Sequence, residues 1–155
     1  MKIESNIKVL LDSNIFDKIL NEKLTIFSNP KLVLIKFQIT HIQYDEISDI
    51  PDEKLDLKID LLELIEVLKC EVVETEGFVQ GISKLGLAKL FSNEDLPQFF
   101  EISGNENGLK DGLLAVTAKA LGSILVTEDV DLRKRCLKHE IGVWNWSDLV
   151  AFLNP

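Results

Sequence analysis

The sequence predicts an α/β fold in which helices cover both faces of a central, mostly parallel sheet. Short apolar runs of strand type alternate with segments of helical periodicity along nearly the whole chain. Such alternation is typical of parallel strands joined by crossover helices. The chain has 155 residues, 46% of them hydrophobic, which fits one domain with a core of its own. Residues 1–155 are therefore expected to form a single domain.

In the first half of the chain, apolar runs that end in a turn predict strands, and apolar stripes of 3.6-residue spacing predict helices. The expected strands cover residues 7–11, 32–39 and 71–73. The expected helices cover residues 15–20, 41–50 and 54–70. Thr40 and Gln43 match a capping box at the start of the second helix, and Pro51 ends that helix.

The second half of the chain continues the same alternation. Its expected helices cover residues 82–91, 95–102, 111–121 and 130–139, with a last helix that Ser147 caps and that ends at Leu153. Its expected strands cover residues 123–126 and 142–144. Gly122 marks the end of the third of these helices, because glycine commonly terminates a helix at its C-terminus.

Two aspartates lie just past the ends of expected strands. Asp12 follows the strand over residues 7–11, and Asp129 follows the strand over residues 123–126. Because parallel strands end at one edge of a sheet, both acids are expected where open α/β folds bind their ligands. The alternative is that each aspartate only caps the next helix, and a second aspartate in the same position weakens that alternative.

Two further acids occupy apolar stripes of helices. Asp111 opens a core-facing stripe in the first turn of its helix. Glu46 shares a face with Ile42 and Ile50, whereas Asp45 falls on the polar side together with His41. His41 and His139 are expected at the surface. An inward glutamate is costly unless it is paired or binds a metal, so Glu46 is a candidate site residue.

The four acids Asp12, Glu46, Asp111 and Asp129 would repel one another at a common edge. Two carboxylates a few ångströms apart cost on the order of 4 kcal/mol at an effective dielectric constant near 20. Hard divalent cations relieve this repulsion, and an all-oxygen site suits Mg²⁺ or Mn²⁺. The two histidines cannot build a zinc site, and the two cysteines, Cys70 and Cys136, are read as reduced thiols.

The net charge of −9 argues against nonspecific attachment to nucleic acid or to an acidic membrane. A nucleic acid would need a local basic patch, and residues 132–138 carry no acid. The candidate substrate-binding residues are Lys110, Arg133, Lys134 and Arg135, although a basic helix face can also be merely solvated. The apolar runs are far shorter than the roughly 20 residues of a membrane span, and a cytoplasmic protein is expected.

Three motifs resemble the PIN domain nucleases. They are LLDSN from Leu10, QYDEI from Gln43, and LKDGLLAVTAKALGSILVTEDVDL from Leu109, whereas residues 74–107 match no motif. The resemblance implies a three-layer α/β/α sandwich in which Asp12, Glu46, Asp111 and Asp129 hold Mg²⁺ or Mn²⁺. It further implies an auxiliary role for Asp131, which could replace Asp129 as the closer ligand. Asn14 and Thr127 would be supporting hydrogen-bonding residues.

The resemblance implies a metal-dependent endoribonuclease that uses a metal-bound water as its nucleophile. The commonest role in the resembling family is the toxin of a bacterial toxin–antitoxin pair. The expected substrate is RNA. An antitoxin partner and a homodimer are both left open. The alternative is a PIN-like scaffold without activity. An aspartyl phosphatase is disfavoured because Asp12-Ser13-Asn14 lacks the second aspartate of its DxD motif, and neither paired acids near the first strand nor a late lysine indicates a receiver domain.

Overall fold

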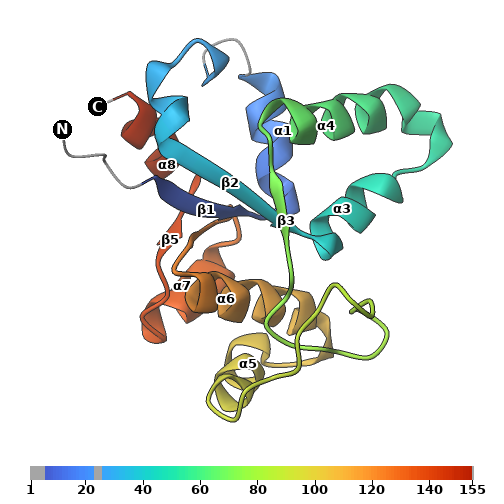
Figure 1. Cartoon of the computed structure of the whole chain (residues 1–155), viewed down its shortest axis with the longest axis vertical. Coiled ribbons are helices and arrows are strands. Elements are labelled where there is room, and N and C mark those ends of the chain that lie inside the picture. Colours follow the sequence, from blue (N-terminus) through green and yellow to red (C-terminus); the bar gives the residue numbers. More distant parts are fainter. Residues whose placement is uncertain (1–5, 23–25, 155) are drawn as a thin grey trace.

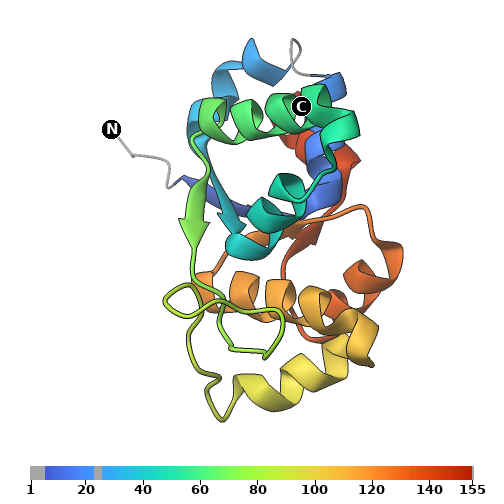
Figure 2. The same ribbon diagram turned by 90° about the vertical axis from the view of Figure 1, so that its right-hand side faces the viewer.

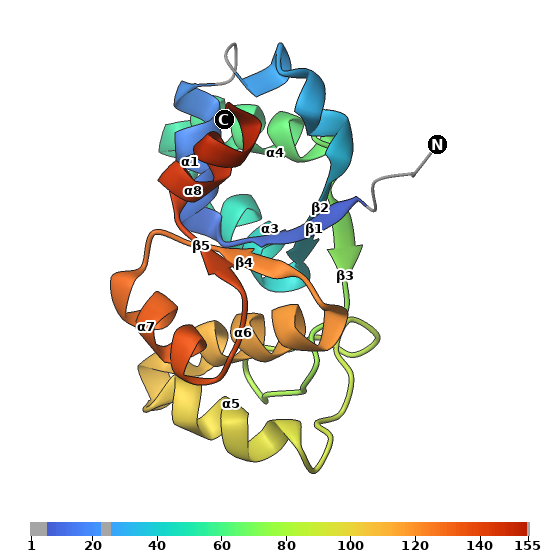
Figure 3. The same cartoon turned by 90° about the vertical axis from the view of Figure 1, so that its left-hand side faces the viewer.

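Five parallel strands form one sheet in the computed structural model, which describes residues 6–22 and 26–154. The strands are β1 (Ile7–Leu11), β2 (Ile35–Thr40), β3 (Glu71–Val73), β4 (Ile124–Val126) and β5 (Val143–Trp144). Their order across the sheet is β3-β2-β1-β4-β5, so β1 is central and pairs with β2 and β4 (Figures 1 and 3). The predicted parallel sheet is confirmed.

Helices lie on both sides of this sheet. One side carries α1 (Ser13–Asn21), α4 (Leu55–Val67) and α8 (Trp146–Leu153), and the other carries α5 (Asp95–Ser103), α6 (Leu109–Leu121) and α7 (Val130–Lys138) (Figures 1 and 3). The short helix α3 (His41–Ser48) follows β2 directly. None of the helices within the described ranges is long and apolar enough to cross a membrane. The architecture is the predicted three-layer α/β/α sandwich.

The central strand β1 supplies both cores. Val9 and Leu11 belong to the apolar cluster on the side of α1, α4 and α8, whereas Leu10 belongs to the cluster on the side of α5, α6 and α7. All three side chains are fully buried. Side chains alternate between the faces of a strand, so a strand with both sets buried must be covered on both faces.

Helix α6 approaches α5 closely because glycine occupies the contact. A Cβ atom on Gly112 would lie 2.0 Å from Ser103 Oγ and 3.0 Å from the Phe99 ring. The Ser103 hydroxyl is itself fixed, since it donates a hydrogen bond to the Phe99 carbonyl at 2.7 Å. The N-terminal turn of α6, which carries Asp111, is thus positioned by tight helix packing.

Most predicted boundaries are confirmed, but the second strand begins later than expected. Residues 30–34 form the 3₁₀ helix η1 (Pro30–Leu34), so β2 begins at Ile35. The Asn29 side chain accepts a hydrogen bond from the Lys31 amide at 2.9 Å, and Pro30 stands at the first helical position. This capped turn overrides the strand preference of the apolar residues that follow.

The predicted helix over residues 82–91 is wrong. Gly81 and Gly86 have φ angles of +85° and +81°, which interrupt a right-handed helix. The chain between β3 and α5, residues 74–94, passes beside α6 (Figure 2). Within it, Thr75 and Ala88 form a parallel bridge. The Glu76 amide attaches it to α6 by donating to Thr117 Oγ1 at 2.9 Å.

The N-cap predicted for the last helix is also wrong. The Asn145 side chain, and not Ser147, accepts a hydrogen bond from the Asp148 amide at 2.8 Å, and the Asp148 side chain accepts one from the Asn145 amide at 2.8 Å. This capping box begins α8 at Trp146. Asn145 and Ser147 are both polar and lie close together in the sequence. Asn145 is the N-cap because Asp148 forms the second hydrogen bond of the capping box with it.

Both cysteines are free thiols, as expected. Burial raises the pKa of Cys70 to about 12 and the pKa of Cys136 to about 11. Because the thiolate is the reactive form, neither side chain is suited to nucleophilic or redox chemistry near neutral pH.

Candidate functional site

The carboxyl ends of β1 and β4 bring two polar residues side by side. The Asp12 amide donates to the Val126 carbonyl at 3.0 Å, which continues the ladder between the strands. Thr127 directly follows the last residue of β4, as Asp12 follows the last residue of β1, and Thr127 is fully buried. The edge predicted to bind a ligand therefore begins with Asp12 and Thr127.

Neutral donors hold the Asp12 side chain by hydrogen bonds. Its Oδ2 atom accepts from Thr127 Oγ1 at 2.7 Å and from Asn14 Nδ2 at 3.1 Å. Its Oδ1 atom accepts from the Ser13 amide at 2.7 Å. With 9% of its surface exposed, this carboxylate is almost buried and its direction is fixed by its surroundings.

The same network reaches Asp129. Thr127 Oγ1 accepts from the Asp129 amide at 3.1 Å, and Asn14 Oδ1 accepts from the Glu128 amide at 3.2 Å. Asp129 Oδ1 caps helix α7 by accepting from the Leu132 amide at 2.8 Å. Asp12 and Asp129 thus both act as helix caps, as the structural alternative predicted, and both also lie at the carboxyl edge of the sheet, where the sequence predicted a ligand site.

Asp111 enters from the first turn of α6. Its Oδ2 atom lies 3.5 Å from Arg135 Nη2 of α7, and about a third of its side chain is exposed. Burial raises the pKa of Asp111 to about 6, with further contributions from the charges of Asp12, Asp129 and Glu46, while Arg135 acts in the opposite direction. Asp111 is thus electrostatically coupled to all three other predicted acids.

Glu46 approaches from α3. Its Oε1 atom lies 3.2 Å from Lys110 Nζ, and 34% of its side chain is exposed. Glu46 therefore lies at the border of the apolar stripe rather than inside it. The neighbouring Asp45 pairs with Lys84 at 2.7 Å, which connects α3 to the segment after β3.

The surface position predicted for His41 is wrong. His41 is 3% exposed, and neither ring nitrogen has a hydrogen-bond partner among the described residues. The residue directly follows the buried end of β2, so the chain enters α3 from inside the molecule. Helical periodicity assigned His41 to the polar face because it ignores the direction from which a helix is entered. His139, by contrast, is partly exposed, with 20% of its side chain accessible.

The pKa of Asp12 is also raised. Burial is the main cause, and the charges of Glu46 and Asp129 act in the same direction against the hydrogen bonds from Thr127 and the Ser13 amide. Carboxylates from β1, α3, α6 and α7 therefore influence one another's ionisation. This is the repulsion that the sequence predicted for a shared edge.

The side chains do not form a finished metal cage. Across residues 6–22 and 26–154, no three acids, histidines or cysteines are arranged closely enough to hold an ion. The donors at this edge are nevertheless oxygens, which match the preference of Mg²⁺ and Mn²⁺. Two of the acids, Glu46 and Asp111, face basic partners instead of a common point. The oxygen donors at this edge therefore fit a divalent cation once these two side chains reorient.

The remaining predicted residues differ in their surroundings. Asp131 is 85% exposed at the side chain and lies 3.7 Å from Lys134, which is also exposed. Arg133 donates from Nη1 to the Thr127 carbonyl at 2.9 Å and so supports the strand end. Of the four basic candidates, Lys134 is therefore the one whose charge is most open to solvent, whereas Lys110, Arg133 and Arg135 contact the site itself.

One acid near the edge was missed by the sequence analysis. Asp17 lies on α1, three residues after Asn14, and lines a cavity of about 270 Å³ with Asn14 and Glu46. A smaller cavity of about 170 Å³ is also lined by Glu46, together with Asp45 and Lys110. The helical spacing from Asn14 to Asp17 was the available signal for this residue.

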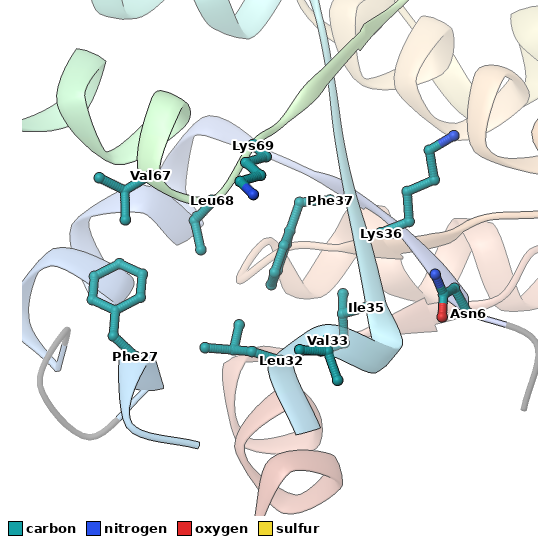
Figure 4. A pocket seen from close by; sticks show the side chains of 10 residues that line it. All are labelled: Asn6, Phe27, Leu32, Val33, Ile35, Lys36, Phe37, Val67, Leu68 and Lys69. Atoms are coloured by element: carbon teal, nitrogen blue, oxygen red, sulfur yellow. The ribbon is translucent and has the colours of Figure 1, made fainter. Parts of the chain in front are cut away.

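A larger cavity, of about 390 Å³, lies away from the acids. It is at the amino ends of β1 and β2, whereas the acids lie beyond the carboxyl ends. Figure 4 shows Phe27, Leu32, Phe37 and Leu68 pointing into the same apolar space. Because it lacks the carboxylates and their hydrogen-bond network, this cavity is not the candidate site.

Solved structures share this fold. PAE2754 from Pyrobaculum aerophilum is 15% identical over 96% of each chain, with a TM-score of 0.61. VapBC2 from Rickettsia felis, solved bound to a DNA fragment from their promoter, is 17% identical over 90% of this chain and 99% of that chain, with a TM-score of 0.56. VapBC-1 from nontypeable Haemophilus influenzae is 15% identical over 91% of this chain and 99% of that chain, with a TM-score of 0.52.

No family model and no curated protein sequence matches the chain. Identities of 15–17% to the solved structures carry information about the fold alone. The similarity covers at least 90% of the chain, and it agrees with the five-stranded parallel sheet and its two helical layers. The chain therefore has the three-layer α/β/α fold that the resemblance of its three motifs implied, and it shares this fold with the solved structures.

Proposed function

We propose that this protein is a divalent-metal-dependent endoribonuclease that hydrolyses RNA phosphodiester bonds. The observation that carries the proposal is the electrostatic coupling of Asp12, Glu46, Asp111 and Asp129 at the carboxyl edge of the sheet. A group of mutually repelling carboxylates is suited to a hard divalent cation, because such cations prefer oxygen ligands and relieve the repulsion. Mg²⁺ and Mn²⁺ are the proposed cofactors.

The four acids would serve as the metal ligands, each positioned by a different part of the fold. Asp12 is kept oriented by Thr127 and Asn14, and Asp129 is fixed at the start of α7. Glu46 and Asp111 complete the set from α3 and α6. A bound Mg²⁺ or Mn²⁺ polarises a phosphate and lowers the pKa of a coordinated water, so no side chain has to serve as nucleophile.

RNA is the proposed substrate, and its phosphates would contact a local basic surface. The overall charge of −9 requires such a surface, since the whole protein repels a polyanion. Lys134 is exposed on α7 just beyond Asp129, and Lys110 lies beside Asp111. These two lysines are the proposed phosphate contacts because both are at least half exposed.

The proposed biological role is that of a toxin whose partner is an antitoxin protein. The resembling family includes such toxins, and two of the similar solved structures are named VapBC. A cytoplasmic location fits this role. The role is separable from the chemistry, because an RNA nuclease of this fold can act without an antitoxin.

A second candidate function is a PIN-like scaffold without nuclease activity. The specific observation in its favour is that no three metal-binding side chains are already arranged around one point in the described chain. In this alternative, Lys110 and Arg135 would neutralise Glu46 and Asp111 permanently. The two functions differ in whether a divalent cation binds at all.

The deciding experiment incubates the protein with single-stranded and structured RNAs in Mn²⁺, Mg²⁺ or EDTA. The nuclease proposal predicts cleavage that the chelator stops and that Asp129→Asn removes. Asp56→Asn, which changes an exposed acid on α4, is the matched control and should cleave like wild type. Absence of cleavage in every metal and with every RNA would favour the scaffold.

A further inference from the structure

The four acids of the candidate site fall into two kinds according to what holds them. Asp12 accepts hydrogen bonds from neutral groups only, and Asp129 caps a helix. Glu46 and Asp111 instead face positive charges, at 3.2 Å from Lys110 and 3.5 Å from Arg135. Two basic side chains are therefore already part of the acidic edge.

Each of these ion pairs joins two helices. Lys110 reaches from the first turn of α6 to α3, and Arg135 reaches from α7 to α6. Half of the Lys110 side chain is exposed, and the other three side chains are roughly one third exposed. Exposed ion pairs contribute little to stability, so these contacts can open at small cost.

Neither ion pair is a tight contact. Arg135 Nη2 lies 3.5 Å from Asp111 Oδ2, and Lys110 Nζ lies 3.2 Å from Glu46 Oε1. Both distances are longer than the roughly 2.7–2.9 Å of a close charge-assisted hydrogen bond. The two acids are therefore held loosely by their basic partners.

We propose that Lys110 and Arg135 are exchangeable counter-ions of the acidic edge, which hold Glu46 and Asp111 and leave them when a divalent cation binds. The inference rests on the proposed metal dependence and adds the residues that regulate it. A cation that takes Glu46 and Asp111 as ligands must displace both ion pairs and meets the repulsion of both charges. Lys110 and Arg135 thereby set the metal affinity of the site.

The test measures Mn²⁺ binding by isothermal titration calorimetry on the full chain. Lys110→Met and Arg135→Met remove the charges and keep unbranched side chains. Each should bind Mn²⁺ about three- to tenfold more tightly than wild type, since a unit charge several ångströms from a divalent ion costs on the order of 1 kcal/mol in water. Lys110→Arg, which keeps the charge, should bind like wild type.

Two matched controls separate a local exchange from a general change of charge. Lys84 makes an ion pair with Asp45, the residue next to Glu46, at 2.7 Å. Lys138 is exposed further along α7 than Arg135. Lys84→Met and Lys138→Met change the net charge by the same amount and should leave the Mn²⁺ affinity within about twofold of wild type. Circular dichroism verifies that every variant is folded.

Unchanged or weaker Mn²⁺ binding in both Lys110→Met and Arg135→Met would overturn the inference, and so would an equal gain in the two controls. Metal-stimulated RNA cleavage by wild type together with such a result would leave the proposed function standing. If wild type binds no Mn²⁺, a double variant that combines Lys110→Met with Arg135→Met decides. Binding by the double variant supports the exchange, whereas its failure to bind overturns both the exchange and the metal-dependent function.

Discussion

The strand-borne half of the candidate site differs from the helix-borne half in how its acids are held. Asp12 and Asp129 follow β1 and β4, and hydrogen bonds to Thr127 and to backbone amides fix them. Glu46 and Asp111 lie on helices, are about one third exposed, and face basic side chains. One half is set by the sheet itself, and the other half is set by ion pairs that can open.

This difference predicts different consequences of mutation. Groups that the scaffold already orients contribute to binding without a cost of rearrangement, whereas groups that must exchange partners contribute less. Changes in the strand-borne half should therefore affect activity most. Changes in the helix-borne half should affect metal affinity and the stability of the metal-free protein.

The largest expected effect is loss of RNA cleavage in Asp12→Asn. The amide keeps the shape but removes the charge of the most buried acid at the edge. Cleavage in Mn²⁺ should fall at least about 100-fold, as expected when a metal ligand is lost. Rates are measured on one RNA at saturating metal, with Asp56→Asn as control. Wild-type rates in both Asp12→Asn and Asp129→Asn would remove the strand-borne half from the chemistry.

A smaller effect is expected from Thr127→Val, which leaves Asp12 with one donor fewer and the Asp129 amide without its acceptor. Loss of the hydrogen bonds made by the Thr127 hydroxyl should destabilise the protein by about 1–3 kcal/mol, and Mn²⁺ affinity should fall about tenfold. Urea unfolding and calorimetry measure the two effects.

The control for this prediction is Thr117→Val. Thr117 is also fully buried, and its hydroxyl accepts from the Glu76 amide at 2.9 Å. This variant should lose a comparable amount of stability while binding Mn²⁺ like wild type. Equal Mn²⁺ affinity in the two variants would mean that Thr127 is only a structural residue.

Asp111→Asn should stabilise the metal-free protein at neutral and higher pH. The pKa of Asp111 in the folded protein is about 6, above its ordinary value of 3.8, so the folded state holds an extra proton between these values. The stability from that proton is present below about pH 4 and is lost as pH rises through about 6. The variant should therefore be more stable than wild type by about 1–2 kcal/mol near pH 8, after allowance for solvent screening, and equally stable at low pH.

Urea unfolding in EDTA at the two pH values measures this difference. Asp131→Asn is the control, because Asp131 is exposed on α7 and should give no gain. A metal-free Asp111→Asn protein that is less stable than wild type near pH 8 would identify Asp111 as a helix-start acid with no part in the cluster.

The smallest expected effect concerns RNA binding by α7. Lys134→Ala should weaken binding modestly and reduce the slope of log affinity against log salt by about one phosphate contact. Lys69→Ala is the control, because Lys69 is exposed beside the apolar cavity at the opposite edge of the sheet. Fluorescence anisotropy in EDTA measures both slopes. Equal slopes in wild type and Lys134→Ala would leave Lys134 a solvated surface residue.

The strand-borne half was predictable from the sequence because it depends on local pattern and one topological rule. An apolar run followed by Asp12, and another followed by Thr127 and Asp129, reach the same edge once the strands are parallel. The capping box at Thr40 and the left-handed Gly122, with φ of +63°, were equally local features. These elements are confirmed because neighbouring residues decide them.

The rest depended on contacts between distant segments. The pairs Lys110–Glu46 and Arg135–Asp111 connect different helices, and helical spacing carries no information about which charges meet. The burial of His41 follows from the path of the chain out of β2, which periodicity does not describe. The predicted helix over residues 82–91 had an apolar pattern, but the conformations of Gly81 and Gly86 overrode it.

The most direct test asks whether both halves contribute to one metal site. Denaturant unfolding with EDTA and with Mn²⁺ is compared in wild type, Asp12→Asn and Asp111→Asn, one acid from each half. Wild type should gain about 2.7 kcal/mol at about 100 times its dissociation constant, and both variants should lose most of that gain at the same Mn²⁺ concentration. A gain equal to that of wild type in either variant would show that its acid is not a ligand, and would contradict the single site formed by strand-borne and helix-borne acids.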